Sequence, residues 1–422
     1  MKRRAGATLL IAVTLGGGAV ALPAQSGFGV TPMAQGILVV DHSGAIPGGG
    51  GLTETRLVQP VLMAVAHGFG NKLGFIATLD FEGATMKGGE LTPGAWGEGY
   101  VDRRHPHTTV HELNVTANDL LGHLDGAGRL SVTIGKGFVP FGTDDPMSRP
   151  FVRYPVNHHL SQLLERAVAT LQYDLGPVTV EGALFNGDEP TQPSDWPLVR
   201  YEGRWRFGDS WSARATVRPL TGLELQGSIA HVHSPESRPG AGPDADKMSV
   251  SARWDAVTPK GERYALVEYA RTSELTGFFV YHTFLAEGLA SRRRLRASYR
   301  FERTERPEEL RLFDLFRTQR PSPDNSILGI SRWSLHTLHV AYDVFLRERK
   351  LTIQPFIEGT LGSVASVGGG VFDPAALYGT DKVRAFSVGV LVGWGMVGHR
   401  MGRYGALAGG MDGMPGMSGM KM

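Results

Sequence analysis

Two stretches of the chain alternate between polar and apolar side chains. From Val199 to Phe207 every even-numbered residue is polar, and the odd-numbered residues are apolar, aromatic or glycine. The even-numbered residues are polar again from Arg292 to Glu302. This period of two is that of a β-strand with two unlike faces. In a soluble sandwich the apolar face would line the core, whereas in a closed membrane barrel it faces lipid and the polar face lines a wet interior.

The N-terminal residues have the layout of a secretory signal peptide. Three cations at 2–4 precede a largely apolar run at 7–15, and small residues at 19–21 suit cleavage. We predict a signal peptide at 1–24 and export of the rest. Without those three cations, 40 of the 43 Lys+Arg remain against 41 Asp+Glu, a net charge of about −1. This balance argues against nucleic acid as a partner, because nucleic-acid binders carry a strongly basic footprint.

The exported chain has to hold together without disulfides, because it contains no cysteine. After the signal peptide there is no run of some 18 apolar residues, so a spanning helix is not predicted. Strands of about 9–11 alternating residues cross a bilayer when they close into a barrel. The hydrogen-bonded ladder of a closed barrel supplies the missing stability.

Period-two segments separated by turn residues predict about sixteen strands along the chain. They lie at 56–66, 72–81, 109–117, 129–138, 166–175, 178–185, 199–207, 211–218, 223–231, 248–257, 264–271, 275–284, 292–303, 335–345, 351–361 and 383–395. We therefore predict an all-β fold, a transmembrane antiparallel β-barrel of about 16 strands (14–18), over residues 55–404. Residues 25–54 are predicted to form an irregular periplasmic lead-in or a plug, and 405–422 a disordered Met- and Gly-rich tail. A large soluble β-sandwich is the alternative.

The predicted links between strands are of two lengths. Very short links, such as 176–177 and 208–210, contrast with long polar ones, such as 303–334. Short turns at one end and long loops at the other are typical of bacterial outer-membrane barrels. The predicted location is the bacterial outer membrane, with its lipid and the barrel-assembly machinery as partners. A homotrimer is compatible with this size, although no residue pattern requires it.

Arginine is concentrated on the polar faces of several predicted strands. The side chains expected to line the bore are Arg200, Arg204, Arg206, Arg214, Arg292, Arg294, Arg296 and Arg300. Guanidinium groups along a water-filled pore attract anions. Acidic neighbours such as Glu202 and Glu302 could instead pair with them and stiffen the wall. We expect pairing for about half of these arginines and a mild anion preference for the pore.

Histidines recur at odd positions near one predicted strand entrance. His105, His107 and His111 share one parity, and an extended backbone places side chains of one parity on one side. Neutral imidazoles are good ligands for first-row metals. The alternative is a polar strand entrance whose histidines bind loop carbonyls and carboxylates.

Methionines recur every third residue in the C-terminal tail. Met411, Met414, Met417 and Met420 stand among Gly, Pro, Asp and Ser, a composition that forms no packed core. Thioethers are soft ligands that suit Cu(I), so Cu(I) is the candidate ion for this tail. The alternative is a disordered low-complexity tail with a chance bias towards Met. No cofactor is otherwise required.

Four short motifs follow one another within residues 97–207. They are Asp102-Arg103-Arg104-His105-Pro106-His107, Pro146-Met147-Ser148-Arg149-Pro150, His158-His159 and Phe185-Asn186-Gly187-Asp188-Glu189-Pro190. They resemble the DRQHPHD, MHRPS, GHH and FNGREPDE boxes of a poorly characterised family of bacterial outer-membrane β-barrel proteins. This chain departs from that pattern at Arg104, Thr108 and Asp188. The resemblance implies a channel-like, porin-like barrel, linked in some members to copper or other heavy metals.

The predicted function is a porin-like channel for passive passage of small solutes, and not an enzyme. The alternative is a barrel that handles copper or another heavy metal through the Met-rich tail and the histidine group. A third hypothesis is a barrel hydrolase. It would use Ser148 or Ser161 with the 158–159 histidine pair and the acidic residues at 144–145.

Overall fold

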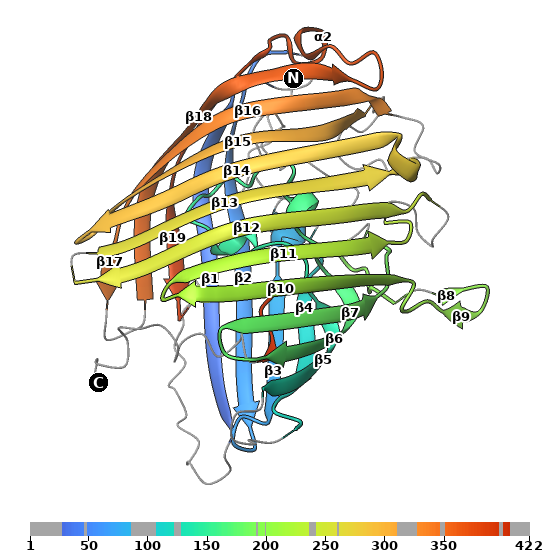
Figure 1. The fold of residues 1–422 in the computed structure, drawn as a ribbon. Coiled ribbons are helices and arrows are strands. Elements are labelled where there is room, and N and C mark those ends of the chain that lie inside the picture. Colours follow the sequence, from blue (N-terminus) through green and yellow to red (C-terminus); the bar gives the residue numbers. More distant parts are fainter. Residues whose placement is uncertain are drawn as a thin grey trace, which may run out of the picture.

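Sixteen antiparallel strands close into one barrel in the computed structural model (Figure 1). The structure describes residues 28–45, 49–85, 107–121, 128–190, 193–198, 200–235, 242–259, 261–309, 327–346, 351–395 and 400–405. The wall consists of β1 (Gly29–Ser43), β2 (Leu52–Gly68), β3 (Leu73–Asp80), β4 (Val110–Ala117), β5 (Arg129–Gly137), β6 (Arg166–Asp174), β7 (Val178–Phe185), β10 (Ser210–Leu220), β11 (Leu223–Val232), β12 (Ala245–Thr258), β13 (Gly261–Glu274), β14 (Phe279–Arg292), β15 (Leu295–Glu309), β16 (Ile327–Tyr342), β18 (Leu351–Gly368) and β19 (Lys382–Trp394). β17 (Val344–Leu346) continues β16 along β18.

Each strand pairs with its neighbour in the chain, and the last pairs with the first. The register between β1 and β19 runs from Ala34 opposite Trp394 to Ser43 opposite Ala385. Closure leaves no open sheet edge in the wall. Because strand direction alternates, the short links such as 175–177 and 221–222 share one end with the start of β1, and the longer links share the other. In outer-membrane barrels the short-link end is periplasmic and the long-link end extracellular.

The two faces of the wall are inverted relative to a soluble protein. On β7, Thr179 and Glu181 are buried inside the barrel, whereas Val180 is 49% exposed and Leu184 is 52% exposed. Such an apolar outer surface is stable only against hydrocarbon. The structure therefore confirms the predicted transmembrane barrel and its location in the bacterial outer membrane. No helix in the described part of the chain is long and apolar enough to cross a membrane.

The lead-in or plug predicted at 25–54 is wrong, because most of it belongs to the wall as β1 and the start of β2. Alternation is hidden in the middle of β1, from Ile37 to Val40, because both faces of the strand are apolar there. Ile37 and Val39 are buried inside, while Leu38 and Val40 are exposed outside. The inner pair packs against Val152, which reaches β1 from inside the barrel.

The barrel strand predicted at 199–207 is also wrong. This segment folds back on itself as β8 (Arg200–Tyr201) and β9 (Arg204–Trp205), a two-stranded hairpin that projects from the wall (Figure 1). Positive φ angles at Glu202 and Gly203 make the tight turn. Polar and apolar side chains can alternate in a hairpin with two solvated faces just as they do in a barrel strand. The alternation at 199–207 therefore did not distinguish the two structures.

Residues 138–165, between β5 and β6, fold into the barrel, and we call them the internal segment. They contain two short 3-10 turns, η1 (Pro146–Ser148) and η2 (His158–Ser161). The Gly142 amide donates to Ser228 Oγ on β11 at 2.9 Å, and the Val152 amide donates to Glu358 on β18 at 2.9 Å. These strands belong to distant parts of the wall, so the internal segment crosses the bore.

Residues 400–405 also lie inside the barrel. Tyr404 Oη donates to Glu112 on β4 at 2.8 Å and accepts from the Phe138 amide at 2.8 Å. The wall therefore ends at Trp394, and the barrel predicted to extend to 404 is ten residues too long. The predicted signal peptide at 1–24 and the tail beyond 405 lie outside the described residues.

The inverted faces make a direct prediction for Leu338 on β16, which is 55% exposed. Leu338→Arg is expected to cost about 2–4 kcal/mol of unfolding free energy, because arginine near the bilayer midplane loses its hydration. Leu220→Arg is the matched control, since Leu220 is 68% exposed but ends β10 at the short-link end, where the cost falls to about 0–1 kcal/mol. Urea unfolding in lipid vesicles measures both values. Equal costs at the two sites would contradict this placement of the membrane.

Candidate functional site

The internal segment is anchored to the wall by buried carboxylates. Glu358 accepts the Val152 and Arg153 amides at 2.9 and 3.0 Å, and Glu302 on β15 accepts the Val156 amide at 3.0 Å. The Arg153 side chain forms an ion pair with Asp41 on β1. A charge-assisted hydrogen bond of this kind is worth about 1.5–3 kcal/mol, which is more than a neutral bond contributes. The segment is therefore held in one position across the bore.

Apolar contacts secure the segment on several sides. Val152, Val156 and Leu160 each belong to a different hydrophobic cluster with residues of the wall. Val152 packs on residues of β1 and β18, and Val156 packs on residues of β16. Leu160 packs on residues of β13 and β14. The bore is thus crossed by a packed segment at this level.

A second group of charges joins the internal segment to residues 400–405. Asp144 lies 2.7 Å from Arg400 Nη2 and 3.1 Å from Arg403 Nη2, and it also pairs with Arg253 on β12. Glu224 on β11 binds Arg400 at 2.9 Å. Asp144 is therefore the carboxylate shared by three guanidinium groups, which we call the Asp144 cluster.

Two of the arginines predicted to line the bore point into it. Arg214 is buried and binds Glu181 through two hydrogen bonds of 2.6 and 2.8 Å. Arg300 is buried, lies over the Phe151 ring and donates to the Arg153 carbonyl at 2.7 Å. Among the described residues no carboxylate lies within ion-pair distance of Arg300. Their contribution to ion passage stays a prediction.

The remaining predicted arginines lie elsewhere. Arg296 is half-buried near the short-link end and pairs with Glu262 at 2.8 Å, and Arg206 pairs with Asp188 and Asp209 outside the wall ladder. The others do not face the bore: Arg200, Arg204, Arg292 and Arg294. The first two belong to the projecting hairpin. Arg292 lies on the outward face of β14, and Arg294 lies in the turn after it. Odd-numbered residues face inward on β14 and even-numbered ones on β15, so one parity does not hold across this turn.

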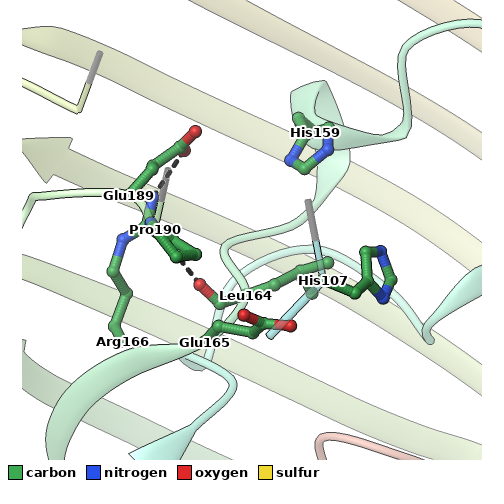
Figure 2. A pocket seen from close by; sticks show the side chains of 7 residues that line it. All are labelled: His107, His159, Leu164, Glu165, Arg166, Glu189 and Pro190. Carbon is green, nitrogen blue, oxygen red and sulfur yellow. Dashed lines mark hydrogen bonds and ion pairs between the residues drawn. The ribbon is translucent and has the colours of Figure 1, made fainter. Parts of the chain in front are cut away.

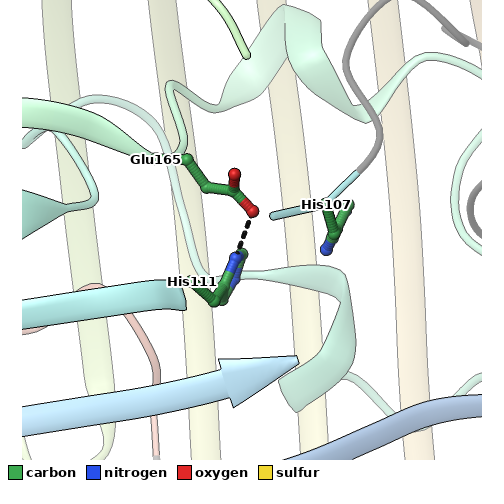
Figure 3. Close-up of side chains that lie close together, drawn as sticks. All are labelled: His107, His111 and Glu165. Carbon is green, nitrogen blue, oxygen red and sulfur yellow. Dashed lines mark hydrogen bonds and ion pairs between the residues drawn. The ribbon is translucent and has the colours of Figure 1, made fainter. Parts of the chain in front are cut away.

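The histidines near β4 are gathered in a buried cluster. His107 and His111 stack at 5.1 Å between ring centroids, and His111 Nδ1 donates to Glu165 Oε1 at 2.5 Å (Figure 3). One ligand atom from each of these three residues lies within 4.8 Å of the others. Asp80 and Glu82, at the end of β3 and in α1 (Glu82–Thr85), form a second such group with His107. His105 lies outside the described residues.

Glu165 is held firmly in this cluster. It has a positive φ of 56°, an uncommon conformation for a residue other than glycine, directly before β6. Its carboxylate accepts from the Thr108 amide at 3.0 Å and from the Thr108 hydroxyl at 2.7 Å. Burial acts to raise the pKa of Glu165, but the charge of His111 and its hydrogen bond outweigh burial and lower the pKa to about 2. The carboxylate is therefore ionised.

A small cavity adjoins the cluster. It is lined by His107, His159, Leu164, Glu165, Arg166, Glu189 and Pro190 (Figure 2). Arg166 Nη2 binds Glu189 Oε1 at 2.5 Å along one side of it. Three of the four motifs noted in the sequence contribute residues to its lining, namely His107, His159 and the pair Glu189 and Pro190.

Sequence patterns did not indicate Glu165, Asp80 or Glu82. Glu165 is separated from His111 by 54 positions, and no periodicity connects them. Asp80 could have been found from its position, because it lies at the end of a predicted strand that is the neighbour of the predicted strand carrying His111. The carboxylate set is a product of the fold.

The residues proposed for a hydrolase are bonded in other ways. Ser148 Oγ donates to the Asp145 carbonyl at 2.7 Å, and Ser161 Oγ donates to the His158 carbonyl at 3.3 Å. Both hydroxyls thus serve the backbone of the 3-10 turns. Asp144 is engaged by arginines, so these residues do not form a nucleophile and base pair.

No protein-family model matches this chain, and no curated protein matches it. Among solved structures, a loop L8 deletion mutant of OmpT, an outer membrane protein of Vibrio cholerae, has 9% identity and a TM-score of 0.49, covering 87% of this chain and 100% of that one. An anion-selective porin from Comamonas acidovorans has 9% identity and a TM-score of 0.48 over the same shares. OprB from Pseudomonas putida has 9% identity and a TM-score of 0.46, covering 87% of this chain and 94% of that one. The fold assignment stands on the closed register and inverted faces of this barrel.

Proposed function

We propose that this protein is an outer-membrane channel for small solutes, with a bore narrowed by the internal segment. The observation that carries the proposal is the polar inner face of a closed sixteen-strand barrel, crossed by a segment anchored on several strands. A wall of this size would otherwise enclose a wide aqueous pore. The anchored segment favours small solutes over large ones.

Ion selectivity is expected to be weak. Most inward arginines face a carboxylate, as Arg214 faces Glu181 and Arg153 faces Asp41. Paired charges contribute little net field to the bore. Arg300 has no carboxylate within ion-pair distance among the described residues, but Glu302 and Glu358 interact with its charge from further away, so the anion preference that we propose is mild.

Planar-bilayer recording tests this function. The folded full-length protein is expected to form ion-permeable pores whose conductance is below that of an open sixteen-strand barrel, with a reversal potential shifted slightly towards the anion. A correctly folded preparation that never conducts would remove the channel function. Trimer formation, proposed from the size of the barrel, is checked in the same preparation by its mass in detergent.

Metal handling is the alternative function. Its Met-rich part, with Met411, Met414, Met417 and Met420 as Cu(I) ligands, lies outside the described residues and stays a proposal. Truncation before Met411 tests it, because unchanged Cu(I) affinity would exclude the tail. The described residues that favour this alternative are the buried histidines at β4.

A further inference from the structure

Three separate parts of the chain meet at the base of the internal segment. Asp80 lies at the end of β3, His107 just before β4, His111 at the start of β4, and Glu165 directly before β6. All four side chains are buried. We propose that His107, His111 and Glu165 form a binding site for a divalent first-row metal ion, for which Zn²⁺ is the reference.

The donor set suits a transition metal. Two imidazoles and one carboxylate are ligands that Zn²⁺ uses in proteins, whereas Mg²⁺ and Ca²⁺ prefer sites made of oxygen. Bonds of 2.0–2.2 Å in a tetrahedral site place ligand atoms about 3.4 Å apart. The ligand atoms of the three residues lie within 4.8 Å of one another, so ion binding requires only side-chain adjustments.

Two buried polar atoms near His107, one on His111 and one on Asp80, give independent support for the site. His111 Nε2 is buried and has no hydrogen-bond partner among the described residues. Asp80 Oδ2 is likewise buried without a hydrogen bond, although it lies 3.3 Å from His107 Nδ1. Leaving such atoms unsatisfied costs free energy. The side chains of His111 and Asp80 therefore each keep one buried polar atom that no hydrogen bond satisfies.

The charges of the cluster leave room for a cation. Lys136 Nζ lies 3.9 Å from Glu165 Oε2, which also accepts from the Thr108 hydroxyl. The other oxygen, Oε1, faces His111 and accepts from the Thr108 amide. The ammonium group and the proposed ion thus lie nearest to different oxygens of the carboxylate. Asp80 and Glu82 add two further carboxylates beside His107.

The position of the site gives it a consequence for the bore. Glu165 ends the internal segment, while His107 and His111 belong to the wall side at β4. An ion shared among them would fasten the end of the internal segment to the wall. The small cavity lined by His107 and Glu165 adjoins the proposed ligands (Figure 2). The inference goes beyond the channel function and does not depend on it.

Metal titration of the folded full-length protein in detergent tests the proposal. Co²⁺ absorption and Zn²⁺ calorimetry are expected to show one equivalent bound. His111→Ala and Glu165→Gln are each expected to weaken binding by roughly tenfold or more. His336→Ala is the matched control, because His336 lies on the outer face of β16 and its removal should leave binding unchanged. Thioethers prefer Cu(I), so these ions do not report on the Met-rich tail.

A second group of histidines, at the surface, could bind the ion instead and provides the result that would contradict the proposal. His231 and His233 lie beside Asp244 and Asp246 at the long-link end, with His233 Nδ1 at 2.6 Å from Asp244. If His231→Ala/His233→Ala abolishes binding, or if both cluster variants bind as the parent does, the proposed site is wrong. Near-native strand content and urea midpoints in the variants exclude misfolding, and Glu165→Gln preserves the side-chain shape if His111→Ala does not fold.

Discussion

Replacing residues 142–160 by a short glycine and serine link is expected to raise single-channel conductance several-fold. The removed residues include the η1 turn, most of the η2 turn and the wall anchors described above from Gly142 to Val156. Conductance rises with the open cross-section of the lumen, and the wall itself is closed by its own ladder. We therefore expect the barrel to persist while its bore widens.

The same replacement is expected to change selectivity. The carboxylates that lose a partner in the internal segment are Asp41, Glu268, Glu287, Glu302 and Glu358. They outnumber the three guanidinium groups, of Arg253, Arg400 and Arg403, that lose Asp144. Water entering the bore hydrates these carboxylates, so their exposure does not carry the penalty of a dry, unpaired charge. A negative lining attracts cations. The reversal potential in a salt gradient should move towards the cation.

Deletion of the projecting hairpin, residues 200–205, provides the matched control. This segment has no ladder contact with the wall, because β8 and β9 pair only with each other. Its loss should leave conductance and selectivity unchanged. If removing the internal segment leaves conductance at the parent value in a folded barrel, then this segment does not limit the bore.

The wall was largely predictable because lipid and water impose opposite demands on neighbouring side chains. β7 has the bounds that its alternation predicted, and its inner Thr179 and Glu181 differ plainly from its outer Val180 and Leu184. The polar and apolar alternation did not predict a strand where the inner face of the wall packs on protein rather than facing water. The middle of β1 is apolar on both faces because Val152 packs on its inner side, and no local pattern reports a contact more than a hundred residues away.

The candidate site was predictable only in part, for the same reason. The shared parity of His107 and His111 follows from local strand geometry, so the sequence indicated that they lie on one side. Glu165 joins them because the internal segment returns to β4 before β6 begins. The Asp144 cluster likewise depends on residues 400–405 entering the barrel. Such contacts depend on how the internal segment and residues 400–405 run through the bore. No periodic pattern in the sequence predicts that path.

The second large effect is expected for Asp144→Asn, which should shift the channel towards anions. Asp144 is the shared partner of Arg253, Arg400 and Arg403, and an amide cannot balance their charge. Removing one partner of a buried ion pair costs roughly 3–5 kcal/mol, so residues 400–405 should also loosen and conductance should rise.

Reversal potential and conductance in a salt gradient measure both effects of Asp144→Asn, with Asp209→Asn as the control. Asp209 also binds an arginine, Arg206 at 2.6 Å, but this pair lies in the link between β7 and β10 rather than across the bore. The control should therefore conduct as the parent does. An unchanged reversal potential in Asp144→Asn would mean that ions do not pass the Asp144 cluster. Their path would then run on the other side of the internal segment, along β2 to β4.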